Sequence, residues 1–174
     1  MAASLLIMVC EITSRKKKLE NTRPELQKAK ADLEKLRDEL IMLSLEDASA
    51  YDLVMGAVKA RRDDPGEPTE KEYQSAIRHA SEVPQETALA CMKVLELSLK
   101  VASIGTKSAA SDVAVAALLA DASLRGAAMN VRINLFDLSD RAFAEAAKGK
   151  LDTQARQASG LTKKVLTQLS RGDF

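Results

Sequence analysis

Leucines recur at helical spacing over a stretch that is long for a chain of 174 residues. The positions that define the repeat are Leu26, Leu33, Leu36, Leu40 and Leu43. Asn21 and Thr22 precede the repeat with side chains suited to an N-cap, and Pro24 suits the first helical turn. The pattern continues toward Val58, and a helix from Pro24 to Val58 would be about 50 Å long at 1.5 Å per residue. Since a small monomeric domain cannot cover such a helix, we expect another element or a partner to pack along it.

Short polar segments divide the rest of the chain. An apolar helix is predicted for residues 2–13, before the basic cluster SRKKK. The segment RRDDPGEPTE is the clearest loop, and Thr69 is predicted to cap the next helix. Pro84 removes a backbone donor, so we expect it to kink or restart this helix, which then ends near a C-cap at Gly105.

Two further helices follow. Ser108 or Ser111 opens the apolar stretch that ends at Leu135. Ser139 or Asp140 is the expected N-cap of a last, more polar helix that reaches the C-terminus.

The predicted fold class is all-α, a bundle of about five helices in a single domain over residues 1–174. No segment alternates polar and apolar residues for long enough to predict a strand. Hydrophobic residues make up 46% of the chain but aromatic residues only 3%, so the core must be built from Ala, Leu, Val and Met. Small side chains of this kind favour closely packed helices.

Charge balance, cysteine spacing and the N-terminal run each argue against one kind of partner, site or location. The 26 basic and 25 acidic residues nearly cancel, so neither nucleic acid nor an anionic membrane is expected as a partner. Cys10 and Cys91 lie far apart without ligand spacing, so we expect two buried thiols, no disulfide and no metal site. The N-terminal run AASLLIMVC lacks a preceding basic residue and is too short to span a bilayer, so a cytoplasmic protein is predicted.

Polar groups interrupt the apolar stretch that ends at Leu135. Gly126, Asn130 and Asn134 are four residues apart and share one helix face. A pair of amides beside a glycine forms a ledge suited to a flat heterocycle, because each amide offers two donors and an acceptor. The alternative, favoured by residue type alone, is that the amides tie down a helix end or a neighbouring loop.

Two carboxylates and a basic cluster are the remaining candidates. Asp47 and Tyr51 are four residues apart on the long helix, where a carboxylate can meet a ligand or a partner helix, although a lone Asp is usually only solvated. Asp112 suits a first helical turn because of the macrodipole. The run Arg15 to Lys18 can bind an anion, although such runs are most often solvated.

Four blocks together resemble, in order and spacing, the cyclodeaminase/cyclohydrolase family of folate enzymes. They read MVCEITSRKKK, EDASAYDLVMGA, ASEVPQETALACMKVLEL and SDVAVAALLADASLRGAAMNVRINLFDLSDRAF, and they cover nearly the whole chain. The resemblance implies an all-helical homodimer with a folate cleft near the subunit interface. It also implies a tetrahydrofolate derivative as the substrate and no prosthetic group.

The resemblance implies an activity at the N5/N10 bridge of tetrahydrofolate. The chain would either cyclodeaminate 5-formiminotetrahydrofolate, releasing ammonia, or hydrolyse 5,10-methenyltetrahydrofolate to 10-formyltetrahydrofolate. The sequence leans slightly toward the cyclohydrolases without deciding. Either reaction needs a proton donor and a proton acceptor near the bridging carbon.

The resemblance also assigns roles to individual residues. Asp47, in the pattern DAxAY, and Asp112, in the pattern SD, are the implied catalytic groups. The implied substrate-binding residues are Lys16, Lys17, Lys18, Tyr51, Asn130 and Asn134. The two asparagines would fix the pterin or shape the cleft, and the lysines would bind the glutamyl tail.

The chain departs from the family pattern at its start. Relatives usually carry a glycine-rich segment of the PGGGS kind before the first helix, whereas this chain begins MAASLL. The expectation is a truncated reading frame, a fragment or a divergent relative, and the alternative function is a catalytically inactive helical dimerisation module.

Overall fold

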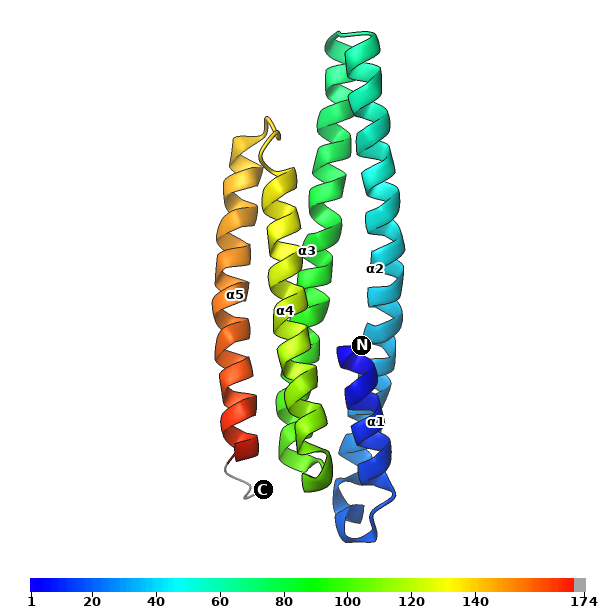
Figure 1. Cartoon of the computed structure of the whole chain (residues 1–174), viewed down its shortest axis with the longest axis vertical. Coiled ribbons are helices and arrows are strands. Elements are labelled where there is room, and N and C mark those ends of the chain that lie inside the picture. Colours follow the sequence, from blue (N-terminus) through cyan, green and yellow to red (C-terminus); the bar gives the residue numbers. More distant parts are fainter. Residues whose placement is uncertain (171–174) are drawn as a thin grey trace.

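The computed structural model describes residues 1–170, which fold into an elongated bundle of α-helices with two short 3-10 helices and no strand (Figure 1). The all-α fold predicted from the sequence is confirmed. In chain order the elements are α1 (Ala2–Ser14), η1 (Lys17–Thr22), α2 (Arg23–Asp63), α3 (Glu67–Ile104), η2 (Lys107–Ala109), α4 (Ala110–Asn134) and α5 (Arg141–Ser170).

The two longest helices, α2 and α3, form an antiparallel hairpin that extends beyond the rest of the bundle (Figure 1). In the far half of α2 the buried residues are Leu43, Ala50 and Ala57, spaced seven apart. This spacing keeps one narrow stripe against α3, and the small alanines let the two backbones approach. The helix predicted to be too long for the domain is therefore covered along one side by α3 of the same chain.

The short helix α1 determines where the bundle is filled and where it is open. It packs against α2, α3 and α4 in one half of the molecule and buries Leu6, Val9 and Cys10. Its N-terminal end lies part of the way along α2 (Figure 1). Beyond that end, α2 and α4 flank α3 without another helix between them.

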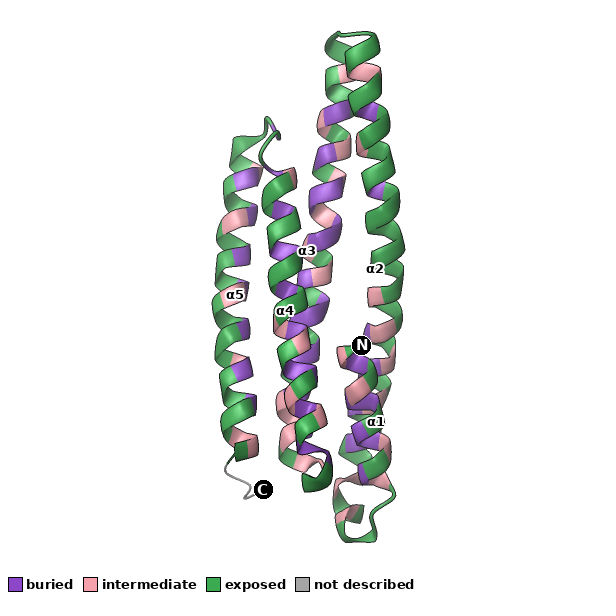
Figure 2. Ribbon diagram, in the orientation of Figure 1, coloured by how far each residue is buried: buried purple, intermediate pink, exposed green. Residues whose placement is uncertain are grey.

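Helix α4 packs against both α3 and α5, which also contact each other, and it carries much of the core. Its buried positions are mainly alanines, with Val113, Leu124 and Val131. Buried residues line the inner faces of α3, α4 and α5, whereas the far half of α2 is mostly exposed (Figure 2). None of the helices within residues 1–170 is both long enough and apolar enough to cross a membrane.

The prediction that the helix restarts at Pro84 was wrong. Helix α3 continues through Pro84 without restarting, and this proline is buried. Helix α3 packs against both α2 and α4, and Val83, Pro84 and Ala88 are buried. Tertiary contacts thus outweigh the loss of one backbone hydrogen bond.

Other helix boundaries differ from prediction by a few residues. Helix α3 begins at Glu67 with Gly66 as the N-cap, and the Thr69 hydroxyl accepts a hydrogen bond from the Gly66 N–H at 3.1 Å. Thr69 therefore closes the cap from inside the first turn. The predicted C-cap at Gly105 is confirmed, and a Cβ there would lie only 2.7 Å from the Val101 carbonyl oxygen. Asp140, as predicted, caps α5 through the Phe143 N–H.

Candidate functional site

A cleft lies between α2 and α4, beyond the N-terminal end of α1. It consists of two adjoining cavities of about 310 and 180 Å³, and both are lined by Asp47 and Asn130. These two residues therefore stand on opposite walls of one continuous cleft. The floor is α3, because no other helix fills the space between α2 and α4 at this level.

The α2 wall presents one carboxylate and one phenol. Ser44, Asp47, Tyr51 and Val54 line it at spacings of three and four residues, so they share one helix face. Tyr51 is 62% exposed. The Asp47 carboxylate has no ion pair or hydrogen bond with any of residues 1–170, which leaves it free for a ligand.

The α4 wall presents the predicted pair of amides. Asn130 and Asn134 line the cleft one turn apart, together with Ser123, Ala127 and Ile133. The prediction that Asn130 and Asn134 form a polar ledge agrees with this position. The two arginines of the same stretch do not contribute to it: Arg125 pairs with Asp121, and Arg132 pairs with Asp152 of α5.

The floor of the cleft contains Ala80, Pro84 and Thr87 of α3. Pro84 has no N–H to donate to the Ala80 carbonyl oxygen four residues earlier. Asn134 supplies the missing donor, with its Nδ2 2.6 Å from the Ala80 oxygen. The bond links the last residue of α4 to the α3 floor, so Asn134 ties down a helix end, as in the alternative interpretation of the amides, but it does not bond to a loop.

The arrangement is suited to acid–base chemistry on a flat, polar ligand. The Asp47 side chain can accept a proton as a carboxylate and donate one as a carboxylic acid. It faces the amides of Asn130 and Asn134, which can donate and accept hydrogen bonds. Apolar surface from Val54 and Ile133 lies beside these groups and can cover a ring. No group of three or more His, Cys, Asp or Glu within residues 1–170 is arranged to hold a metal ion.

The other predicted site residues lie at the opposite end of α4. Asp112 is in the first turn of α4, about 27 Å along the helix axis from Asn130 at 1.5 Å per residue. Lys16 lies at the same end and donates from Nζ to Thr106 Oγ1 at 2.6 Å and Ser108 Oγ at 3.0 Å. Lys17 and Lys18 are exposed in η1. A single chain therefore does not bring these residues together with Asp47.

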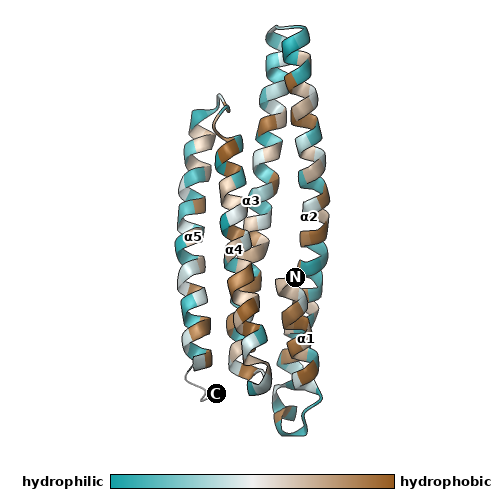
Figure 3. Cartoon of the chain, in the orientation of Figure 1, coloured by the Kyte–Doolittle hydropathy of each residue, from teal (hydrophilic) through white to brown (hydrophobic). Residues whose placement is uncertain are grey.

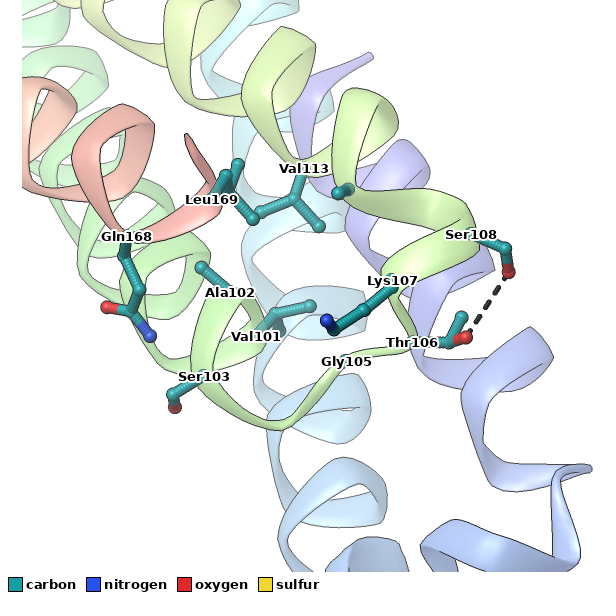
Figure 4. A pocket seen from close by; sticks show the side chains of 11 residues that line it. Val101, Ala102, Ser103, Gly105, Thr106, Lys107, Ser108, Val113, Gln168 and Leu169 are labelled. Carbon is teal, nitrogen blue, oxygen red and sulfur yellow. Dashed lines mark hydrogen bonds between the residues drawn. The ribbon is translucent and has the colours of Figure 1, made fainter. Parts of the chain in front are cut away.

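A separate cavity, of about 470 Å³, lies at this end of the bundle (Figure 4). Val101, Val113 and Leu169 form its apolar side, and Lys107 reaches toward it. Its lining contains no carboxylate. Because it lacks an acid–base pair, we assign the candidate active site to the cleft between α2 and α4.

The two cysteines line neither the cleft nor the separate cavity. Cys10 and Cys91 are free and buried, and burial raises the pKa of each thiol to about 11. Lys30 opposes this effect at Cys10, and the N-terminal ammonium opposes it at Cys91. The prediction that both thiols are buried is confirmed.

Sequence reasoning did not identify every residue of the cleft. Ser44 and Thr87 were missed, and Pro84 was interpreted only as a helix breaker. Ser44 lies one turn before Asp47, so helical spacing alone was enough to find it. The position of Thr87 and Pro84 opposite Asp47 depends on how α2 and α3 pair, which the sequence does not indicate.

The family model described as formiminotransferase-cyclodeaminase matches residues 1–153. The chain belongs to this family. The resemblance identified from the sequence is thereby confirmed. Among solved structures, formiminotetrahydrofolate cyclodeaminase from Thermotoga maritima superposes with a TM-score of 0.88 at 30% identity, over 100% of this chain and 84% of that one. This family member therefore also shares its fold with that enzyme.

Curated relatives carry the names of both activities implied by the resemblance. Methenyltetrahydrofolate cyclohydrolase from Methylorubrum extorquens is 35% identical over 95% of this chain and 80% of its own length. Formimidoyltransferase-cyclodeaminase from Rattus norvegicus is 26% identical over 97% of this chain, which corresponds to 32% of the rat protein. The prediction of a folate enzyme of this family agrees with these names.

Proposed function

We propose that this chain is a folate one-carbon enzyme whose reaction takes place in the cleft between α2 and α4. The observation that carries the proposal is the position of Asp47, a carboxylate without a partner among residues 1–170, across the cleft from Asn130. The fold and family supply the reaction class. Of the two activities we propose methenyltetrahydrofolate cyclohydrolase, because the cyclohydrolase relative shares more sequence over most of both chains.

Asp47 has a direct role in the proposed hydrolysis. Water adds to the methenyl carbon of 5,10-methenyltetrahydrofolate, and Asp47 accepts one of its protons. The bond from this carbon to N5 then breaks, and Asp47 returns the proton to N5. The added hydroxyl loses its proton to solvent and becomes the formyl oxygen, so the cation is converted to neutral 10-formyltetrahydrofolate and one proton is released.

Cyclodeamination is the second candidate because it uses the same groups. In that reaction N10 attacks the formimino carbon, Asp47 transfers the proton, and ammonia leaves. The Thermotoga structure, named for this activity, has the same fold over the whole of this chain. Asn130 and Asn134 would hold the pterin in either reaction.

We also propose a homodimer in which each cleft lies near the subunit interface. The far half of α2 exposes several large apolar side chains, and hydrophobic bands recur along it (Figure 3). Met42 is 64% exposed and Leu45 is 59% exposed. On α4, Met129 and Ile133 are exposed beside the cleft. Exposed apolar patches of this kind mark interaction surfaces.

A dimer would also give a role to the residues at the opposite end of the bundle. If two copies pack side by side in opposite directions, Lys16 and Asp112 of one copy lie nearer to Asp47 of the other. The glutamyl tail could then be held by lysines of the partner.

Dimers that combine one Asp47→Asn chain with one Lys16→Ala chain test this shared site. Such a mixed dimer contains one site with both residues intact, so it should be more active than either variant alone. Mixed dimers without this gain in activity would contradict the shared site.

The absorbance of the methenyltetrahydrofolate chromophore provides the test of activity. Purified protein is given methenyltetrahydrofolate in one cuvette and formiminotetrahydrofolate in another. Loss of the chromophore above the spontaneous rate identifies a cyclohydrolase, and its appearance with ammonia identifies a cyclodeaminase. No change in either cuvette would support the inactive dimerisation module. A cytoplasmic location stays a prediction.

A further inference from the structure

A proline in the floor of the cleft leaves one backbone carbonyl without its helical partner. Residues 80 and 84 both lie within the continuous helix α3, where an N–H at position 84 would donate to the Ala80 oxygen. Pro84 has no N–H, so this acceptor is unpaired within the helix. Both residues are buried, and an unpaired buried acceptor is costly.

Asn134 occupies this acceptor from the neighbouring helix. Its Nδ2 lies 2.6 Å from the Ala80 oxygen. A carbonyl oxygen only accepts hydrogen bonds, so the amide nitrogen, and not the amide oxygen, must be the atom that faces Ala80. The Oδ1 of Asn134 is therefore turned away from the α3 backbone, and it receives no hydrogen bond from residues 1–170.

We propose that Pro84 is a positioning residue for ligand recognition, acting through Asn134. Because Pro84 has no N–H, the Ala80 carbonyl oxygen stays available as the acceptor that orients the Asn134 amide. Asn134 then presents a fixed acceptor to the cleft and selects a ligand with an N–H donor at that place. Resting on the proposed function, the inference assigns this donor to the ring N–H or amino group of the reduced pterin.

Asn130 provides a matched control. It carries the same side chain one turn earlier on α4 and lines the same cleft, but it makes no hydrogen bond to the backbone of α3. Its amide is free to rotate and can offer either a donor or an acceptor. A general effect of altering the α3 backbone would reach both asparagines, whereas the proposed effect is confined to Asn134.

The test is a pair of double-mutant cycles that measure the dissociation constant of 5-formyltetrahydrofolate, with KM and kcat alongside. Pro84→Ala restores an N–H that competes for the Ala80 oxygen, so binding should weaken about fivefold with kcat nearly unchanged. Asn134→Ala should weaken the binding of 5-formyltetrahydrofolate about tenfold. The double variant with Pro84→Ala should bind it no more weakly than Asn134→Ala alone. The effects of Pro84→Ala and Asn130→Ala should multiply instead. Independent effects of Pro84→Ala and Asn134→Ala would overturn the proposal.

A readout without ligand separates this inference from the proposed function. In the wild-type protein one NMR signal of the Asn134 side-chain amide, identified by its absence in Asn134→Ala, should be protected from exchange with water. Pro84→Ala should remove that protection while leaving the melting temperature equal or higher. If the wild-type protein binds no folate but Pro84→Ala still removes the protection of the Asn134 amide, the proposed function is refuted and the positioning of Asn134 by Pro84 is supported. Unchanged protection in Pro84→Ala would refute the positioning role whether or not folate binds.

Discussion

Asn134 donates from its side chain to the Ala80 carbonyl oxygen at 2.6 Å, the same oxygen that Pro84 leaves without a helical donor. This bond joins α4 to α3 at the cleft, so it should also contribute to folding. Replacement of Asn134 by Asp would place two acceptors against each other. We expect Asn134→Asp to lower the free energy of unfolding at pH 7 by about 1–3 kcal/mol in urea titrations.

The decrease in the free energy of unfolding caused by Asn134→Asp should depend on pH. A protonated Asp is again a donor, so the folded state favours the protonated form and the deficit should shrink as the pH falls toward about 4. Asn130→Asp, at a side chain that makes no hydrogen bond to the α3 backbone within residues 1–170, is the control, and it is compared in the Asp47→Asn background because Asp47 lines the same cleft. An equal loss in both variants would contradict the specific role of the bond to Ala80.

Asp47 should be required for turnover but not for folding. Its side chain is on the exposed half of α2 and has no partner among residues 1–170, so Asp47→Asn should leave the melting temperature within a few degrees. The rate constant kcat should fall by about 10² to 10⁴, the usual contribution of a general acid or base. Asp52→Asn, an exposed carboxylate five residues further along α2, is the matched control and should retain full activity.

Charge on the exposed face of α2 should separate the two copies of the proposed dimer. Leu45→Glu replaces an apolar side chain that is 59% exposed and should halve the mass measured by light scattering. The fold of the monomer should persist, because Leu45 is not part of the core. Lys163→Glu, on the exposed side of α5, should leave the mass unchanged. A monomeric wild-type protein would contradict the proposed dimer.

Lys16 should affect the binding of the glutamyl tail more than catalysis. Lys16→Ala removes an ammonium that bonds to Thr106 and Ser108 at one end of the bundle. We expect KM for a polyglutamylated folate to rise about threefold to tenfold, with little change for the monoglutamate. The increase should diminish at high salt, because screening weakens the contribution of the lysine in the wild type as well. Lys28→Ala, an exposed lysine of α2, is the control.

The two thiols should be inert in the folded protein. Burial raises the pKa of Cys10 and of Cys91 from 9.0 to about 11, so both stay protonated and shielded at pH 8. Iodoacetamide should react with them slowly until guanidinium is added. Because the unfolded thiols ionise at lower pH than the folded ones, their contribution to stability is complete below pH 9 and is lost between pH 9 and about 11. Rapid labelling of the native protein at pH 8 would show that either thiol is accessible.

The sequence by itself determined the helical fold, most of the helix ends and the family. Leucine spacing along α2, the break before α3 and the caps at Gly105 and Asp140 are local signals that depend on a few neighbouring residues. The pairing of Asn130 with Asn134 on one face also follows from the period of a helix.

Only the tertiary structure decided which of these groups meet. The short length of α1 leaves the gap between α2 and α4 open, and this gap places Asp47 opposite Asn130. Lys16 and Asp112 remain at the other end, because a straight helix keeps distant residues apart. Pro84 was expected to kink or restart its helix, yet α3 continues through it, and the Ala80 carbonyl oxygen that has no helical donor accepts a hydrogen bond from Asn134 instead. The position of Pro84 can be read from the sequence. The donor that replaces its N–H is Asn134, which lies 50 residues later on α4 and comes close to Ala80 only in the folded chain.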